Sequence, residues 1–276
     1  SPRAVPTPML TVGETATRGV VLNVAKGTVI DPWGNTDHFR KVEAFVGSRF
    51  ADKLIGGGGR EEFWGLMGSD TIIGGGDRDT VDYNFDDNCG GMNGIIANLQ
   101  RSVSGGQVIG TIRDGFGNLD HVTDIERVIG TRFGDVFNGS SLDNQFWGGE
   151  GKDSFDGRGG WDGVRFDIQF SDRRMTGINV DLSRATGQII NDGFGNTETA
   201  RNIDWVLGSD HADRIKGSAG HNWIEGDGGA DTMTGGGGVD EFFFDNTSVV
   251  GPLDIITDFV RGKDLSFAPE VSQPPR

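Results

Sequence analysis

Acidic residues recur at a fixed spacing of nine along this 276-residue chain. Each nine-residue unit begins with glycine, has an acid or an asparagine in sixth place, and has an apolar residue in eighth place. Twelve such units form three runs of four, which start at Gly47, Gly130 and Gly208. Because carboxylate and amide oxygens are the ligands that Ca²⁺ takes from proteins, the spacing predicts rows of calcium sites.

The candidate ligands are the sixth residues of the twelve units: Asp52, Glu61, Asp70, Asp79, Asp135, Asn144, Asp153, Asp162, Asp213, Asn222, Asp231 and Asp240. One more acid lies nine residues before the first ligand of each run, and Glu43, Glu126 and Asp204 thereby extend the rows. Mg²⁺ fits less well because it is smaller and gives up water reluctantly. Zn²⁺ prefers His and Cys, which do not recur at ligand spacing.

The elements that position these ligands follow from the same unit. Glycine permits a tight turn with positive φ, and the apolar eighth residue predicts a strand of about three residues. So short a strand is stable only when neighbours stack on it. Turn, strand, turn and strand then make a flattened coil of eighteen residues with the eighth residues inside. The sequence predicts an all-β fold, a parallel β-roll.

The distance between coils suits a calcium ion. Parallel strands lie about 4.8 Å apart, so acids eighteen residues apart would lie on one edge and repel each other without a cation. Ca²⁺ has oxygen ligands at about 2.3–2.6 Å, and carbonyls of the turns can complete a shell of roughly 6–8 oxygens. The expected pairs are Asp52/Asp70, Glu61/Asp79, Asp135/Asp153, Asn144/Asp162, Asp213/Asp231 and Asn222/Asp240.

A longer repeat divides the chain into three blocks. Residues 31–48, 114–131 and 192–209 are versions of one phrase. The predicted blocks, each a spacer followed by a roll, are 19–93 (spacer 19–46, roll 47–86), 94–176 (spacer 94–129, roll 130–167) and 177–267 (spacer 177–207, roll 208–245, cap 246–267). An N-terminal linker, 1–18, and a C-terminal tail, 268–276, remain.

The nine-residue unit resembles the RTX nonapeptide, G-G-x-G-x-D-x-U-x, of hemolysin-type calcium-binding proteins. Gly148–Asp153 and Gly235–Asp240 match GGxGxD completely. The spacers resemble those of large bacterial calcium-binding proteins, and "DIITDFVRGKDLSF" is similar to the tail that closes the roll in RTX-bearing secreted proteases. The resemblance implies a parallel β-roll that binds several Ca²⁺ ions, type I secretion, and folding triggered by extracellular calcium.

Several units depart from the RTX pattern. Phe50, Phe133 and His211 replace the fourth glycine in the first unit of each run, and Asn144 and Asn222 are neutral ligands. We therefore expect complete sites where third and fourth units take part, and weak or empty sites where a block starts.

The composition and the motifs of the chain restrict which partners and functions it can have. Forty-one acids against 25 bases give a net charge of -16, which argues against nucleic acid because phosphate binding needs a basic surface. Cys89 is the single cysteine, so no intrachain disulfide can form. No apolar run approaches the roughly 20 residues of a membrane span. The chain has no HExxH motif, GxSxG elbow or P-loop, so we predict that it is not an enzyme.

The first functional hypothesis is a calcium-folded structural, surface or adhesion element of a secreted bacterial protein, either extracellular or at the cell surface. A second is the non-catalytic C-terminal module of a secreted hydrolase, protease or epimerase. A third is a glycan-binding adhesin that uses Trp33, Phe116 and Phe194, which precede Gly-Asn in the three phrases. A cell-surface glycan or protein partner and self-assembly stay open.

Overall fold

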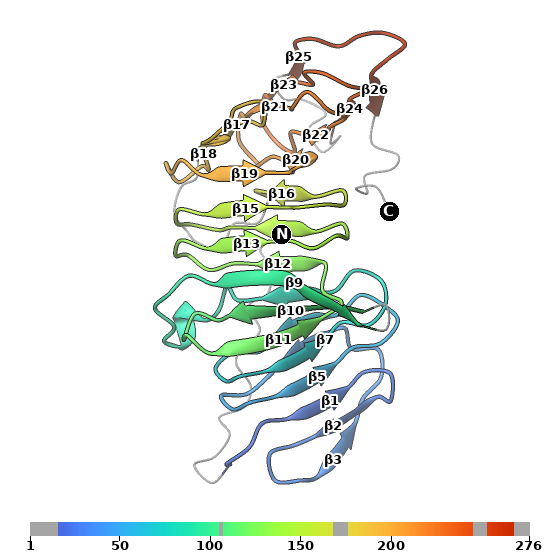
Figure 1. Ribbon diagram of the computed structural model, residues 1–276, viewed down its shortest axis with the longest axis vertical. Helices are drawn as coiled ribbons and strands as arrows, with labels where there is room; N and C mark the ends of the chain where they lie inside the picture. Colours follow the sequence, from blue (N-terminus) through green and yellow to red (C-terminus); the bar gives the residue numbers. More distant parts are fainter. Residues whose placement is uncertain (1–15, 105–106, 168–175, 245–252, 268–276) are drawn as a thin grey trace. The chain divides into compact units, whose positions relative to one another are not determined.

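The computed structural model describes residues 16–104, 107–167, 176–244 and 253–267. The chain divides into two compact units, Ser1–Leu142 and Asp143–Arg276. Nearly every element is a short strand, and the one helical segment among the described residues is the 3-10 turn η1 (Asp87–Cys89) (Figure 1). The all-β prediction is confirmed. The described residues include no helix with the length and apolar content needed to cross a membrane.

In the first unit, short parallel strands stack into two sheets. One sheet has the order β4 (Ala44–Val46), β6 (Glu62–Trp64), β8 (Thr80–Asp82) and β12 (Arg127–Ile129). The other has the order β3 (Thr36–His38), β2 (Thr28–Ile30), β1 (Val21–Asn23), β5 (Lys53–Ile55), β7 (Thr71–Ile73), β11 (Leu119–Thr123), β10 (Gln107–Arg113), β9 (Ile96–Ser104) and β13 (Val136–Asn138). Among the described strands of this unit, antiparallel pairs occur where the spacers enter the second sheet, at β1–β2–β3 and β9–β10–β11.

The second unit repeats this design. One sheet has the order β14 (Gln145–Trp147), β16 (Gly163–Arg165), β20 (Trp205–Leu207), β22 (Trp223–Glu225), β24 (Glu241–Phe243) and β26 (Leu265–Phe267). Another has the order β18 (Ile189–Asn191), β17 (Asn179–Asp181), β21 (Arg214–Lys216), β23 (Thr232–Thr234) and β25 (Ile255–Ile256). β15 (Ser154–Asp156) pairs with β19 (Thr199–Arg201).

The predicted coil of eighteen residues is present. Phe63 lies beside Val81, and Ile224 lies beside Phe242, in parallel strands. Both pairs are eighteen residues apart, so neighbouring coils repeat in register. The parallel β-roll is therefore confirmed.

The spacers contribute strands to the rolls. β12 pairs with β8, and β20 pairs with β16, so a spacer strand lies directly beside the fourth unit of the preceding roll. The edge of a roll carries unpaired N–H and C=O groups, and the spacer strand satisfies them. The three-block division stays a prediction about the sequence.

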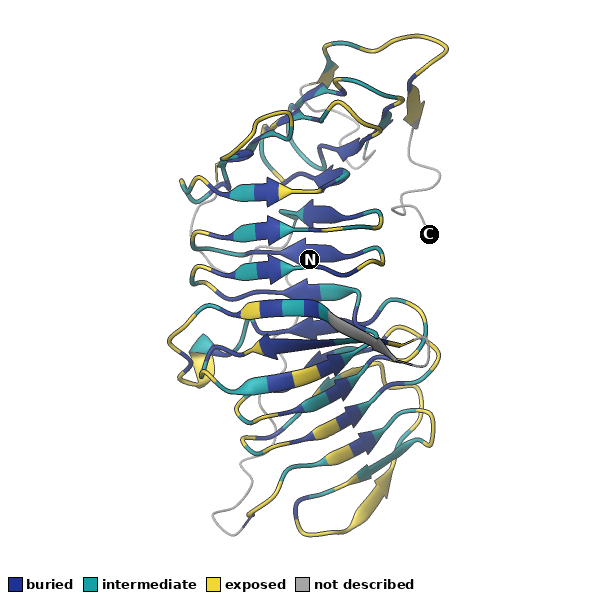
Figure 2. Cartoon of the chain, in the orientation of Figure 1, coloured by how far each residue is buried: buried dark blue, intermediate teal, exposed yellow. Residues whose placement is uncertain are grey.

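The interior is thin and apolar. All twelve eighth-position side chains are at most 2% exposed, and Figure 2 shows buried residues along the strands. They are Leu54, Phe63, Ile72, Val81, Phe137, Phe146, Phe155, Val164, Ile215, Ile224, Met233 and Phe242. Burying one such side chain contributes about 1.5–3 kcal/mol, which a three-residue strand gains only by stacking. The predicted core is confirmed.

Candidate metal centre

The twelve sixth-position residues form buried columns beside the strands. Each is at most 6% exposed. Within a column, the main-chain N–H of one residue donates to the side-chain oxygen of the residue eighteen later. The distances are 2.8 Å for Asp52/Asp70, Glu61/Asp79 and Asp213/Asp231, 2.7 Å for Asn144/Asp162 and 3.0 Å for Asn222/Asp240. The sixth expected pair, Asp135/Asp153, is divided between the two units, and its geometry stays a prediction.

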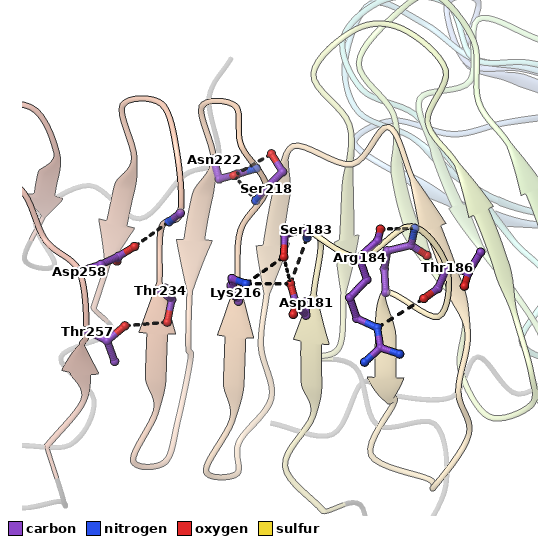
Figure 3. Close-up of polar contacts among 12 residues, drawn as sticks. Asp181, Ser183, Arg184, Thr186, Lys216, Ser218, Asn222, Thr234, Thr257 and Asp258 are labelled. Atoms are coloured by element: carbon purple, nitrogen blue, oxygen red, sulfur yellow. Dashed lines mark hydrogen bonds and ion pairs between the residues drawn. The ribbon is translucent and has the colours of Figure 1, made fainter.

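In one class of loop, the sixth-position side chain accepts two hydrogen bonds from the second residue of its own loop. Ser48 donates its main-chain N–H to Asp52 Oδ2 (2.6 Å) and its Oγ–H to Asp52 Oδ1 (2.9 Å). Thr131 and Ser209 do the same for Asp135 and Asp213. In the loop that ends at Asn222, the N–H and Oγ–H of Ser218 both donate to Oδ1 (Figure 3). We call these four the closed loops.

In a second class, one carboxylate oxygen has no such donor. Asp70, Asp79, Asp162 and Asp231 each accept a main-chain N–H from the preceding coil on Oδ1. Their Oδ2 atoms are buried and have no hydrogen-bond partner among the described residues. We call these four the open loops. A buried, unsatisfied carboxylate oxygen is costly, and a bound cation removes that cost.

The backbone separates the two classes. In every open loop, the second and fourth residues of the unit have positive φ. Four of these residues are not glycine: Leu66 (63°), Asp77 (65°), Arg158 (69°) and Asp227 (65°). A non-glycine residue in this region costs roughly 1–3 kcal/mol. No described residue of a closed loop has positive φ, and there the N–H of the second residue reaches the carboxylate.

The loops ending at Asp153 and Asp240 share the open-loop backbone. Their second and fourth residues are glycines with φ between 86° and 117°. These are the two loops that match GGxGxD completely. The open-loop backbone therefore occurs in the third and fourth units of every run, the units in which complete sites are expected, and the sites themselves stay a prediction.

In the open loops, the first glycine of the unit lies against the acid. A Cβ on Gly65 or Gly226 would overlap with Oδ2 of Asp70 or Asp231, and a Cβ on Gly157 would lie 2.6 Å from Asp162 Oδ2. The described residues contain no group of three or more His, Cys, Asp or Glu side chains that could hold a metal. A cation here would therefore combine one or two carboxylates with main-chain carbonyls, an all-oxygen shell that suits Ca²⁺.

Burial dominates the electrostatics of the open loops. Desolvation raises the pKa of Asp70 to about 9, of Asp162 to about 8, and of Asp79 and Asp231 to about 7. Neighbouring carboxylates contribute to these values in the same direction as burial. Burial also raises the pKa of Asp213, in a closed loop, to about 7. A raised pKa therefore reflects burial in both classes of loop. The unsatisfied oxygen is what distinguishes the open loops from the closed ones.

The three acids predicted to extend the columns lie in different settings. Asp79 donates its N–H to Glu126 Oε2, and Asp162 donates its N–H to Asp204 Oδ2, both at 3.0 Å. Glu126 and Asp204 thus follow the fourth unit of a roll. Glu43 is exposed and directly precedes β4.

Sequence reasoning missed four further acids in the columns. Asp120, Glu198, Asp254 and Asp264 accept N–H groups from Asp70 (2.9 Å), Asp153 (3.0 Å), Asp231 (2.9 Å) and Asp240 (3.2 Å). A signal was available for two of them, because Gly115-Asp120-Val122 and Gly193-Glu198-Ala200 repeat the first, sixth and eighth positions of the unit.

The three phrase aromatics share a loop and differ in exposure. Asp31 Oδ1 accepts the N–H groups of Trp33 and Asn35, and Asp114 and Asp192 cap their own loops in the same way. Trp33 is 48% exposed, whereas Phe116 and Phe194 are half-buried. A glycan-binding role for the three stays a prediction.

Comparison with known proteins gives one family. Residues 46–81, 55–88, 129–164 and 207–242 match the model of the RTX calcium-binding nonapeptide repeat. All twelve sixth-position residues lie inside these stretches, and the two spacer acids Asp120 and Glu198 lie outside them. No curated protein matches the chain. RTX nonapeptide repeats bind calcium ions, so the predicted resemblance and cofactor are confirmed.

Proposed function

The chain carries RTX calcium-binding nonapeptide repeats, and from that premise we propose that it is a calcium-folded β-roll module of a secreted bacterial protein, with a structural or surface role outside the cell. The observation that carries this proposal is the buried, unsatisfied Oδ2 of Asp70, Asp79, Asp162 and Asp231. These carboxylates need either a proton or a cation, and Ca²⁺ supplies the missing charge.

We divide the sixth-position acids into two groups by their proposed roles. The acids of the open loops, with Asp153 and Asp240, hold the ions together with loop carbonyls. In the closed loops, Asp52, Asp135 and Asp213 already accept several hydrogen bonds. We assign them chiefly to holding coils together.

Calcium binding of this kind controls folding. A ligand at 10 times its Kd stabilises the folded state by about 1.4 kcal/mol per site, whereas a domain is stable by only about 5–15 kcal/mol. Several sites can therefore decide whether the rolls fold. Extracellular calcium modules bind with Kd values of about 10⁻⁴–10⁻³ M, so such a module folds after it leaves the cell.

Circular dichroism tests the proposal. The protein is depleted of calcium and then titrated with Ca²⁺, and with Mg²⁺ as the control cation. We expect the calcium-depleted protein to keep only part of its β-strand signal, which Ca²⁺ should restore cooperatively and Mg²⁺ much more weakly. A strand signal that persists unchanged after calcium depletion would sink the proposal.

One observation favours the version in which a secreted enzyme carries this module. The tail packs onto the roll, since β25 and β26 pair with β23 and β24. Asp258 accepts the N–H groups of Gly235 and Gly236, both at 2.8 Å, and Thr234 bonds Thr257 at 2.7 Å (Figure 3). Such a closing tail resembles that of secreted proteases. The coding sequence upstream decides, because the absence of an enzyme-sized domain there removes this version.

A further inference from the structure

The spacer phrase contains a cryptic repeat unit. Gly115, Asp120 and Val122 hold the first, sixth and eighth positions of a nine-residue unit, outside the stretches that match the RTX repeat. Val122 is buried and pairs with Ile72, the eighth residue of the third unit. The unit therefore takes the place of the next coil in this column.

Asp120 accepts a hydrogen bond from Asp70 in the same way as each repeat acid accepts one from the preceding residue of its column. The N–H of Asp70 donates to Asp120 Oδ1 at 2.9 Å, as the N–H of Asp52 donates to Asp70 Oδ1 at 2.8 Å. Asp70 Oδ2 is buried and has no hydrogen-bond partner among the described residues. In this column, Asp70 thus has an unsatisfied oxygen, and the next acid along the column is Asp120 from the spacer.

Of the two acids beside Asp70, Asp120 is the less saturated. Asp52 accepts three hydrogen bonds, from Val20 N–H, Ser48 N–H and Ser48 Oγ–H. Asp120 accepts two, from Asp70 N–H and from the Tyr83 hydroxyl at 2.8 Å. Each carboxylate oxygen has two lone pairs, so Asp120 retains capacity for a cation.

Negative charge accumulates around this pair. Asp70, Asp86, Asp114 and Asp120 are all at most 1% exposed. Neighbouring carboxylates raise the pKa of Asp70, Asp86 and Asp120 in addition to burial, and Asp114 is among the neighbours of all three. Buried charges need an opposite charge or a metal, and a cation shared by Asp70 and Asp120 would supply it.

We propose that Asp120 is a ligand to a calcium ion that it shares with Asp70, so that the spacer phrase completes the last site of this column. The inference rests on the proposed function. It changes the role of the spacer, which becomes a source of ligands. Loop carbonyls would supply the remaining oxygens of a shell of roughly 6–8.

The second unit contains a second case. Glu198, the sixth residue of the cryptic unit that begins at Gly193, accepts the N–H of Asp153 at 3.0 Å. The first phrase supplies a control, since Asp37 holds the same place but is exposed on β3, the edge strand of its sheet. Only phrases that follow a roll therefore place this acid in a column.

Isothermal titration calorimetry with CaCl₂ tests the proposal on the full chain. The variants are Asp120→Asn, Glu198→Gln, Tyr83→Phe and the control Asp37→Asn. We expect Asp120→Asn and Glu198→Gln each to bind one ion fewer, or one ion at least tenfold more weakly. Tyr83→Phe and Asp37→Asn should bind the wild-type number, because both retain the proposed ligands.

Thermal unfolding separates ligation from a structural role. If Asp120 only holds the fold together, Asp120→Asn lowers Tm equally with and without calcium, and its calcium stoichiometry is unchanged; that result overturns the inference. If Asp120→Asn fails to fold, Asp120→Glu replaces it, because it keeps the charge and should bind the wild-type number of ions. A folded Asp120→Glu protein that matches wild type in Tm without calcium but binds fewer ions also counts against the inference. If the wild-type protein binds no calcium, the proposed function itself fails, and this inference fails with it.

Discussion

The main-chain N–H of Asp162 donates a 3.0 Å hydrogen bond to Oδ2 of Asp204, forty-two residues further along the chain. Asp162 Oδ2 has no hydrogen-bond partner among the described residues, and the charge of Asp204 raises the pKa of Asp162. An acid of the repeat and an acid of the spacer thus lie together. The behaviour of such pairs without calcium can be predicted.

Without calcium, stability should fall as the pH rises. The folded-state pKa values of Asp70 (about 9), Asp162 (about 8) and Asp79 (about 7) lie above the unfolded value of about 3.9. The folded state therefore binds more protons between about pH 4 and pH 9, and the free energy of unfolding declines through that window. Urea denaturation at pH 5 and pH 8 in calcium-depleted buffer measures this decline.

Calcium should reduce that pH dependence, because the ion replaces the protons. Calcium affinity should accordingly rise with pH over the same range. Greater stability at pH 8 than at pH 5 in the absence of calcium would contradict the prediction.

Asp231→Asn and Asp213→Asn should differ in their response to calcium. Both acids are buried and have pKa values raised to about 7, but Asp231 ends an open loop and Asp213 a closed one. Asp231→Asn removes a ligand charge, so calcium affinity should fall at least tenfold (about 1.4 kcal/mol or more). The calcium-free protein should lose little stability, since a buried charge is removed.

Asp213→Asn should instead cost stability under both conditions. Its oxygens accept three donors, the N–H and the Oγ–H of Ser209 and the N–H of Ile178, and the single oxygen of an amide, with two lone pairs, cannot accept all three. Leaving a buried donor unsatisfied costs about 1–3 kcal/mol. Calcium titrations monitored by circular dichroism, together with thermal melts of each variant, check both results. Equal calcium affinities for the two variants would be inconsistent with the two loop classes.

Two glycines of one loop should tolerate alanine differently. A Cβ on Gly157 would crowd Asp162 and the carbonyl of Asn202, whereas a Cβ on Gly159 meets nothing within 4 Å. Gly157→Ala should weaken calcium binding and lower Tm. Gly159→Ala should be neutral or stabilise by about 0.4–1 kcal/mol through the unfolded state. Melting curves of the two variants with and without calcium provide the comparison. Equal decreases in Tm would mean that the close approach of Gly157 to Asp162 is not needed for calcium binding.

The thin core should be sensitive to truncation. Phe242 is fully buried and lies 6.3 Å from Phe259 between ring centroids. Phe242→Ala should cost about 3–5 kcal/mol, which is a large share of the stability of a domain. Val239→Ala, at an exposed position of the preceding turn, should change stability by less than about 0.5 kcal/mol. Chemical denaturation in saturating calcium provides the comparison, and a small effect at Phe242 would argue against the stacked core.

Much of the fold could be predicted because its rule is local. Glycine in first place, an acid in sixth and an apolar residue in eighth specify a turn and a strand within nine residues. Phe63 and Ile224 were thereby predicted to be buried, and Asp52/Asp70 to be adjacent, and all of this is confirmed. The metal-ligand roles themselves stay predictions.

The spacers were harder to place because their pairing is not local. Asp120 and Glu198 carry the repeat pattern, but each follows a hairpin or loop of its own length after the roll. The separations of 50 residues for Asp70/Asp120 and 45 for Asp153/Glu198 fit no common period. A rule based on spacing alone therefore missed them.

The sequence by itself determined the eighteen-residue coil, the identity of the core and the columns of acids, because a short strand with one apolar residue is stable only when stacked. Tertiary structure alone decided which carboxylates are saturated. Ser48 N–H reaches Asp52, whereas the positive φ of Leu66 accompanies an unsatisfied oxygen on Asp70. It also decided which distant acid completes a column, because that depends on where the chain returns to the edge of the roll.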